Sequence, residues 1–501
     1  MTNRFNLIDE AWIPIADVGR VSLRQIFSDT SSDTKLRALG GNPVQKIALM
    51  KLLLAIAQAA STPKDLEEWR HLGWHGLAER CLAYLDRWHE RFFLYGEQPF
   101  LQMPDIVAAR IQSYGAVLPE VSTGNTTVLT QGQSERPLGS EDKALLLIVL
   151  MGFALGGKKT DNSVVLAPGY RGKSNDKGKA STGKPGPAVA HMGLLHCFCL
   201  GESLAQSLWL NLLTLEDIAG SGLYSGGLGT PVWEAMPVSE DCQAARSLKL
   251  TLQGRLVPLS RFCLLTDGGM HYSEGLAHSS YLEGVVDPSV AVNFSGAKAK
   301  VLWVNPDKRP WRELTALLSF LQSQQGSFEC LQLRISVSRS PSAVGRLGVW
   351  AAGLKVSSNA GEQYVSGSDD AVESVIWLDT SDLNSDWFSQ LKTEVEALEG
   401  TAKSLFGCVS GFYKQLLTDG TDHAKQSSNQ FWQLCERDFQ KLVINCETGA
   451  QYQGERQKLR RRFADYAYQI YNRYCPQDTA RQLDAWAKCR PNLAKYLKQE
   501  V

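Results

Sequence analysis

The sequence lacks the residue patterns that identify several common protein classes. Its 11 cysteines include no Cys-x-x-Cys pair, which excludes a zinc ribbon and a thioredoxin-type motif and fits reduced, buried thiols. There is no Gly-x-Ser-x-Gly nucleophile elbow and no Asp-x-Asp cluster of the kind found in two-metal nucleases. We therefore expect a chain that is not an enzyme and that needs no metal or cofactor.

Long hydrophobic segments are also scarce. The longest apolar run, residues 144–155, is interrupted by Gly152 and is shorter than the ~20 residues that span a bilayer. No hydrophobic signal-peptide core follows the first residues, Met-Thr-Asn-Arg-Phe-Asn. These observations predict a cytoplasmic protein with no membrane partner.

Net charge is absent as well, since 52 basic side chains balance 52 acidic ones over 501 residues. The 44% apolar and 21% charged content is that of a folded globular protein, and the length favours two or three domains. A neutral total first argues against a nucleic-acid partner. The charge is unevenly distributed, however, and a local basic segment can present a positive field to phosphates.

The first basic segment, residues 156–187, is rich in glycine and lysine. It contains seven glycines, three prolines, two acidic residues and seven basic ones: Lys158, Lys159, Arg171, Lys173, Lys177, Lys179 and Lys184. Glycine lets a backbone approach a ligand closely, and long irregular segments are often functional. We interpret it as a loop that meets a polyanion; a solvated surface loop is the alternative.

The second basic segment, residues 451–501, has 11 basic and five acidic side chains. Tyrosines and tryptophans alternate with its arginines. The basic cluster is Arg456, Lys458, Arg460, Arg461 and Arg462. Two interpretations remain open: a bundle core with a basic solvent face, or a positive helix surface that lies along a nucleic-acid backbone.

Two short motifs resemble known sites but depart from them. Residues 178–185 nearly match a phosphate-binding P-loop, but Pro185 replaces the Ser or Thr that would bind magnesium. His71 and His75 have the spacing of a zinc-binding helix, but Leu72 stands where a metalloprotease has glutamate. Neither pattern is sufficient for an active site.

Hydrophobic periodicity predicts an α+β fold. Strands are expected at residues 13–15, 21–23, 248–252, 300–304 and 375–378, and helices at 43–91, with a break at Ser61 and Thr62, and at 142–155. A polar loop is expected at 355–370. Apolar stripes then predict four helices around residues 387–398, 405–416, 431–442 and 463–474. We therefore expect a mixed domain, 1–378, followed by an all-α four-helix bundle, 379–501.

Several strings resemble one family. Residues 5–15 (FNLIDEAWIPI) resemble the opening of the large subunit, CasA, of the type I-E CRISPR surveillance complex Cascade. Residues 93–102 (FLYGEQPFLQ) resemble that family's HPFxQ segment, with Gln98 in place of histidine, and 121–126 (VSTGNT) resemble the start of its guide-side loop. The glycine-lysine segment and the terminal bundle follow in the same order.

The resemblance implies a non-catalytic subunit. Its partners would be other Cascade subunits, a CRISPR guide RNA, double-stranded target DNA and a helicase-nuclease. Such a subunit reads the protospacer-adjacent motif in double-stranded DNA, helps to start strand separation and supports recruitment of the nuclease. In RNA-guided systems the protein reads this short motif and base pairing reads the remaining sequence.

The resemblance also assigns residues. The guide-side loop corresponds to Val128, Leu129, Thr130 and Gln131. The glycine loop corresponds to Gly156, Gly157, Lys158 and Lys159, or to the stretch with Gly169, Arg171, Gly172 and Lys173. The wedge that opens the duplex corresponds to Lys355, Ser358, Asn359 and Ala360, and His278 is the nearest polar match to a motif-contacting lysine of the family.

Two other functions remain alternatives. One is a P-loop-like nucleotide hydrolase that uses Lys184, and the other is a scaffold that binds only proteins.

Overall fold

The computed structural model describes residues 4–31, 33–118, 138–153, 191–279, 281–283, 286–322, 328–359, 362–364 and 370–498. The chain divides into two compact units, Met1–Trp311 with Gln325–Val375 (unit 1) and Arg312–Gln324 with Ile376–Val501 (unit 2). The division after Val375 lies in β12 (Asp370–Asp379), the strand in which the sequence boundary at residue 378 also falls. Assignment of residues 312–324 to unit 2 was not expected.

The first elements of unit 1 follow the sequence prediction closely. Strands β1 (Ile13–Ile15) and β2 (Gly19–Val21) pair antiparallel. The expected second strand is displaced toward the N-terminus, because Ser22 caps helix α1 (Leu23–Ser28) and its side chain accepts a hydrogen bond from the backbone N–H of Gln25.

Three long helices form much of the core of unit 1. They are α2 (Pro43–Ala60), α3 (Leu66–Arg87) and α5 (Ser140–Gly152), and α2 packs against the other two. The predicted break between α2 and α3 is present, and Asp65 caps α3, its side chain accepting a hydrogen bond from the backbone N–H of Glu68. Helix α2 is long and apolar enough to cross a membrane by length and composition, and 72% of it is buried inside the protein, as in a core helix.

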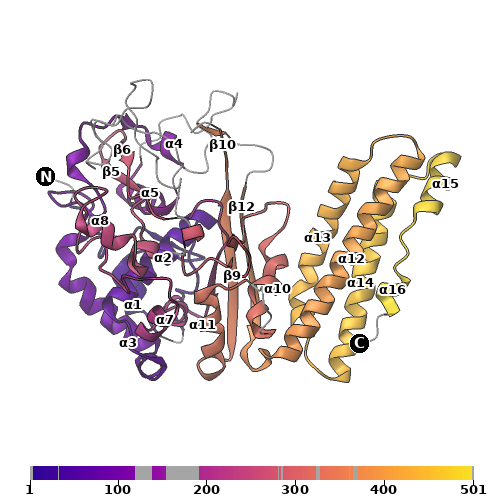
Figure 1. Ribbon diagram of the computed structural model, residues 1–501, viewed down its shortest axis with the longest axis horizontal. Helices are drawn as coiled ribbons and strands as arrows, with labels where there is room; N and C mark the ends of the chain where they lie inside the picture. The colour runs from indigo at the N-terminus through magenta and orange to yellow at the C-terminus, as the bar shows by residue number, and fades with distance from the viewer. Residues whose placement is uncertain are drawn as a thin grey trace. The chain divides into compact units, whose positions relative to one another are not determined.

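The main sheet of unit 1 has the strand order β12-β9-β4. Strand β4 (His196–Leu200) pairs antiparallel with β9 (Arg346–Lys355), from His196 opposite Ala352 to Leu200 opposite Gly348. Helix α2 packs on β9, while α6 (Leu204–Leu210) and α11 (Leu331–Arg339) pack on β4. In Figure 1, β9 and β12 stand side by side as long strands.

Smaller elements complete unit 1. The strands are β3 (Ile111–Gln112), β5 (Arg261–Leu265), β6 (Met270–Glu274), β7 (Val292–Asn293), β8 (Lys300–Val301), β10 (Ser357–Asn359) and β11 (Glu362–Tyr364). The helices are α4 (Tyr114–Val117), α7 (Leu215–Gly220), α8 (Gln243–Leu248) and α9 (Leu252–Leu256). Among the described residues of both units, 3-10 helices are found at His89–Arg91, Pro104–Ile106, Tyr281–Glu283, Pro310–Glu313, Ser319–Gln322, Ser340–Ser342 and Thr380–Asp382.

Two strand predictions in this part need correction. The expected strand 248–252 is wrong: Leu248 ends α8 and Leu252 begins α9, whose N-cap is Thr251. The expected strand 300–304 is limited to Lys300 and Val301. The predicted strand 375–378 lies within β12.

Unit 2 is built around three long helices, α12 (Ser385–Gln415), α13 (Thr421–Ile444) and α14 (Ala450–Tyr474), which run side by side in Figure 1. Short helices α15 (Ala480–Cys489) and α16 (Ala494–Lys498) pack on α12 and α14, and α10 (Leu314–Leu317) packs on α12. The predicted helices 387–398 and 405–416 are one continuous helix, so the four predicted helices are three long ones, and the short helix α15 was not predicted. The predicted α+β class with a helical C-terminal part is confirmed.

Candidate nucleic-acid interface

The described chain that follows the glycine-lysine segment lies beside β9, the strand that leads to the wedge residues. The described chain resumes at His191, and two residues later the backbone N–H of Gly193 donates to the carbonyl of Leu354 on β9 (3.0 Å). Gly193 has a φ of +77°, and an added Cβ would lie 3.3 Å from the Trp303 ring. A glycine is therefore required where the chain enters the sheet.

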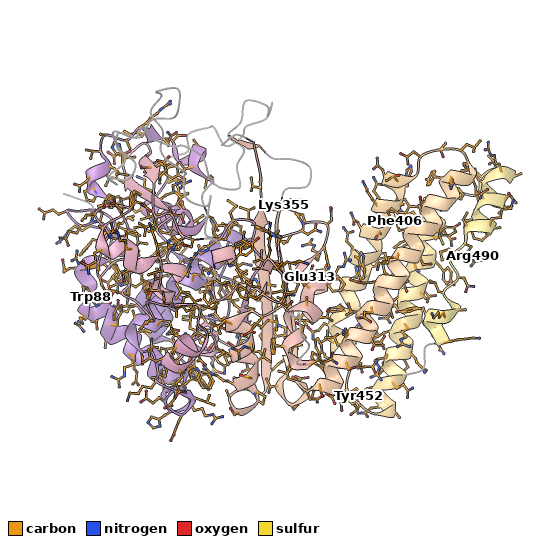
Figure 2. All side chains as sticks on the ribbon, in the orientation of Figure 1. Trp88, Glu313, Lys355, Phe406, Tyr452 and Arg490 are labelled. Carbon is orange, nitrogen blue, oxygen red and sulfur yellow. The ribbon has the colours of Figure 1, made fainter. Side chains whose placement is uncertain are left out.

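The wedge region is a β-hairpin rather than the expected polar loop. Beyond Lys355, the last residue of β9, strands β10 and β11 pair antiparallel, with Ser357 opposite Tyr364 and Asn359 opposite Glu362. Figure 1 places β10 beyond the end of β9, and Figure 2 labels the half-buried Lys355 there. Ser358 and Asn359 are thus held in a paired backbone, whereas Ala360 lies outside the described residues.

Most other predicted contact residues also lie outside the described part of the chain. This holds for Gly156, Gly157, Lys158, Lys159, Gly169, Arg171, Gly172 and Lys173, for Val128, Leu129, Thr130 and Gln131, and for the P-loop-like residues 178–185. What the structure does describe is the place where residues 154–190 begin and end. The carbonyl of Gly152, the last residue of α5, accepts a hydrogen bond from the backbone N–H of His191 (3.2 Å).

An exposed aromatic and basic surface next to this place was missed in the sequence. Trp303 is 56% exposed and packs edge-on against Tyr281, with ring centroids 6.1 Å apart. Phe294 is 52% exposed, and Lys298 and Lys300 are exposed on the β7–β8 hairpin. Exposed aromatic rings with nearby lysines are typical of surfaces that bind nucleic acid. The alternation of lysine with small residues from 296 to 300 was a usable signal.

His278 does not occupy such a surface. It is buried, and its Nε2–H donates to the carbonyl of Pro258 (2.6 Å). Burial, with a smaller contribution from the Arg255 charge, lowers the pKa of His278 to about 3. Its assignment as the polar group that contacts the motif is therefore corrected, because its ring faces the protein interior.

A cavity of about 890 Å³ lies between the segment that resembles HPFxQ and the start of α5. Its lining includes Tyr95 and Gln98 from that segment, and Leu138, Ser140 and Lys143 from the residues that follow position 137. The hydroxyls of Tyr95 and Ser140 are 3.1 Å apart. The segment that resembles HPFxQ thus lies beside residues 138–143, which follow the guide-side loop in the sequence.

In unit 2, two of the predicted phosphate-binding arginines are inside the bundle. Arg456 and Arg460 are 8% and 4% exposed. The guanidinium of Arg460 donates to both oxygens of Glu394 on α12 (2.9 and 2.6 Å). Arg456 donates to the carbonyls of Asn445 and Glu447 just beyond the end of α13 (2.6 and 2.8 Å). The expectation that both side chains lie on a basic surface is wrong, since each is committed to internal partners.

Arg461 and Arg462 face outward on the same helix. Arg462 donates to Asp438 on α13 (2.8 Å), which also accepts from Lys441 and Tyr466. Burial opposes ionisation of Asp438, but these three hydrogen bonds outweigh it and hold its pKa below the usual range. Two cations, Arg462 and Lys441, thus share this one carboxylate.

The histidine pair is not a metal site in this fold. Gly73, between His71 and His75, has a φ of +58° and a ψ of 178°, which interrupts α3 and removes the common helix face on which i, i+4 ligands depend. Among the described residues, no group of three or more His, Cys, Asp or Glu side chains could hold a metal ion.

Comparison with known proteins supports a single family. A profile of "CRISPR-associated protein Cse1 (CRISPR_cse1)" matches residues 6–470. The CRISPR-associated protein CasA/Cse1 of Thermus thermophilus is 28% identical over 342 residues, which cover 63% of this chain and 60% of that protein. The alignment thus spans less than two thirds of that relative.

Solved structures share the fold over nearly the whole chain. The crystal structure of Thermobifida fusca Cse1 has a TM-score of 0.76 at 20% identity, covering 99% of this chain and 98% of that one. The crystal structure of CasA from Thermus thermophilus has a TM-score of 0.72 at 21% identity, covering 99% of both chains. A chain of a structure described as "CRISPR RNA-guided surveillance complex" has a TM-score of 0.67 at 16% identity, covering 99% and 100%. Since the profile match extends from residue 6 to residue 470, the chain belongs to the CRISPR-associated protein Cse1 family.

Proposed function

We propose that this chain is the DNA-recognition subunit of a type I-E Cascade complex. It assembles with the other Cascade subunits and a guide RNA, reads the protospacer-adjacent motif in double-stranded DNA and helps to start strand separation. It then supports recruitment of the helicase-nuclease and performs no catalysis itself. Membership of the Cse1 family and the fold shared with a chain of an RNA-guided surveillance complex support this assignment.

The observation that carries the proposal is the hydrogen bond between Gly193 and Leu354. It joins the chain that follows the glycine-lysine segment to the strand that leads into the β10–β11 hairpin, although the two are far apart in the sequence. A subunit that reads a motif and opens the adjacent base pairs needs a phosphate-binding element and a wedge held in fixed register. A common sheet that holds the chain after the segment and the chain before the hairpin supports this requirement.

The sheet supplies the rigidity that such work requires. Strand β9 is buried along most of its length, between α2 on one side and its neighbours β4 and β12 in the sheet. The hairpin is therefore anchored to a packed core and does not extend from a free loop. Lysines of residues 158–173 and Lys355 would contact phosphates, while Ser358 and Asn359 would contact the opening base step.

The test uses the whole complex, assembled with its guide RNA, and target duplexes randomised at the motif. Alanine at Lys158, Lys159, Arg171 and Lys173 should weaken binding and flatten its salt dependence by about one counterion for each cation that no longer meets a phosphate. A matched control removes four exposed charges from unit 1 at Lys64, Arg70, Arg80 and Arg87 on or beside α3. This control should leave the salt slope unchanged.

Two results would contradict the proposal. If the complex without this chain bound target DNA as tightly as the complete complex, the chain would be a protein scaffold. If both charge-removal variants lowered the salt slope equally, the effect would come from net charge and not from the predicted segment.

A further inference from the structure

The indole ring of Trp303 is an exposed aromatic surface on a fixed support. The side chain is 56% exposed, although tryptophan is highly buried on average in folded proteins. Part of the ring lies over Gly193, where an added Cβ would be 3.3 Å from it, and Tyr281 packs edge-on against it with ring centroids 6.1 Å apart. These contacts hold the ring in place and leave its remaining surface open to solvent.

The backbone at Trp303 is tied to the strand that leads into the β10–β11 hairpin. Trp303 forms an antiparallel β-bridge with Leu194, and the N–H of Val304 donates to the carbonyl of Gly193 (2.8 Å). The N–H of Gly193 in turn donates to the carbonyl of Leu354 on β9 (3.0 Å). Neighbouring backbones in a sheet lie just under 5 Å apart, so Trp303 is about 10 Å from the end of β9.

A second exposed ring and positive charge lie along the β7–β8 hairpin. The register pairs Asn293 with Lys300, so Phe294, which is 52% exposed, lies at one end of the hairpin and Trp303 beyond the other. The two positions are separated by roughly four residues of strand, or about 13 Å. Residues 294–309 contain four basic side chains and one acidic one, and Lys300 is exposed between the two rings.

This combination of groups fits unpaired nucleic acid. Every base has a face that can stack on an aromatic ring, but in a duplex that face is covered by the neighbouring base pairs. Lysines beside the rings supply cations for the phosphates of the same strand. An apolar surface can also bind a protein, but the excess of basic over acidic side chains around these rings favours a polyanion.

We infer that Trp303 is a stacking site for bases of the displaced DNA strand, with Lys298 and Lys300 on its phosphates. The inference rests on the proposed function, in which the β10–β11 hairpin helps to open the duplex. The target strand pairs with the guide RNA, so the displaced strand is the one whose bases remain unpaired. A base that stacks on Trp303, about 10 Å from β9, no longer pairs with the target strand, and the open state is thereby stabilised.

The test uses the whole complex with its guide RNA and a matched target whose displaced strand is already unpaired. Trp303→Leu keeps an apolar side chain but removes the ring, so it should weaken binding about tenfold, and Trp303→Phe should recover most of the loss. Neither variant should alter the salt dependence. Lys298→Ala/Lys300→Ala should instead lower the salt slope by about 1.4, the value for two contacts to single-strand phosphates.

Two control variants separate stacking from other effects. Trp88→Leu removes a half-buried tryptophan elsewhere in unit 1, which Figure 2 labels, and it should leave binding unchanged. Leu282→Ala removes an exposed apolar side chain next to Tyr281 that has no ring, and it should also bind normally. Thermal unfolding verifies that each variant is folded.

Photocrosslinking identifies the strand directly. Iodouracil at successive positions of the displaced strand should crosslink to Trp303 when the guide matches the target, and should not when the duplex stays closed. No crosslink, together with unchanged binding by Trp303→Leu, would overturn the inference, and motif-dependent binding by the same wild-type complex would leave the proposed function intact. If Leu282→Ala and Trp303→Leu instead both impaired assembly with the other subunits, the surface would bind protein and the inference would be wrong.

Discussion

Arg460 on α14 donates two hydrogen bonds, of 2.9 and 2.6 Å, to the carboxylate of Glu394 on α12 inside the helical bundle of unit 2. The two side chains are 5% and 1% exposed, and Gln390 donates a further hydrogen bond to the same carboxylate. This bidentate geometry is the strong form of an ion pair. Arg460, which the sequence analysis predicted to contact a nucleic-acid backbone, thus joins two helices inside the bundle.

The first prediction concerns this pair. Arg460→Met should lower the free energy of unfolding by about 3 kcal/mol, because the buried Glu394 carboxylate loses two charge-assisted hydrogen bonds and keeps only one nearby cation, Arg456 at 3.7 Å. The double variant Arg460→Met/Glu394→Leu should recover most of the loss. Calorimetry of the full chain measures both, with the exposed neighbour in Arg461→Met as the control. Equal stability of wild type and Arg460→Met would contradict the structure.

The second prediction separates surface charge from core charge on α14. Arg461→Glu should change stability little, since the side chain is exposed, but it should reduce affinity of the complex for matched and mismatched motif DNA by similar factors. Arg461→Lys keeps the charge and should bind normally, because a phosphate contact needs only the cation. If only one class of motif lost affinity, Arg461 would be reading bases and the proposed backbone contact would be wrong.

The helical spacing of the residues in α14 predicts which arginines are buried better than a count of basic residues does. Arg456 and Arg460 precede Phe463 and Ala467 by seven residues each, so all four fall on one face of a helix. Phe463 was correctly assigned to the core, and the same spacing places both arginines beside it. The partner could not be predicted, because Glu394 is on another helix and no local pattern links the two.

Elsewhere the success of the sequence prediction follows the length and regularity of the pattern. Helices α2, α5, α13 and α14 were found because apolar residues recur with the helical period over several turns. The strand prediction for residues 248–252 was wrong, because a few apolar residues fit a strand as well as the ends of two short helices. The hairpin β10–β11 is polar and two-sided, so it carried no periodic signal.

The candidate interface was only partly predictable for a related reason. Motif resemblance predicts a glycine-lysine segment and a wedge, but the hydrogen bond between Gly193 and Leu354, which lie next to them in the sequence, depends on the pairing of β4 with β9. Lys51 was visible as a single charge within an apolar helix, which indicates a buried partner. Its identity, Asp287, required the fold.

The third prediction concerns pH. Burial lowers the pKa of His278 and of His196 to about 3, from an ordinary value of 6.5. Between these values the unfolded chain binds protons that the native chain does not. The free energy of unfolding should therefore fall as pH drops below about 6.5, by at most about 1.4 kcal/mol per pH unit for each histidine.

Denaturant midpoints at pH 7.5, 6.0 and 5.0 measure this dependence. His278→Gln keeps a donor for the carbonyl of Pro258 and removes the titrating group, so its stability should fall less steeply with acid. The exposed His71→Gln variant is the control and should follow wild type. A profile for His278→Gln as steep as that of wild type would mean that this histidine does not remain neutral in the native chain.

The last prediction divides motif binding from duplex opening at the end of β9. Lys355→Ala should reduce binding itself, because its expected partner is a phosphate. Ser358→Ala/Asn359→Ala should leave initial binding largely intact and slow strand opening, since unstacking a base step costs a few kcal/mol that contacts from the hairpin must partly offset.

The paired backbone of Ser357 to Asn359 with Glu362 to Tyr364 holds these positions in place, so small side chains can act without a long wedge residue. Stopped-flow fluorescence on a duplex with a fluorescent base beside the motif resolves the two steps, and Gln363→Ala, at the position opposite Ser358, is the control for general loss of the hairpin. Equal opening rates for wild type and the double alanine variant would remove the hairpin from the opening step, and the wedge would then have to lie among the residues between 260 and 345.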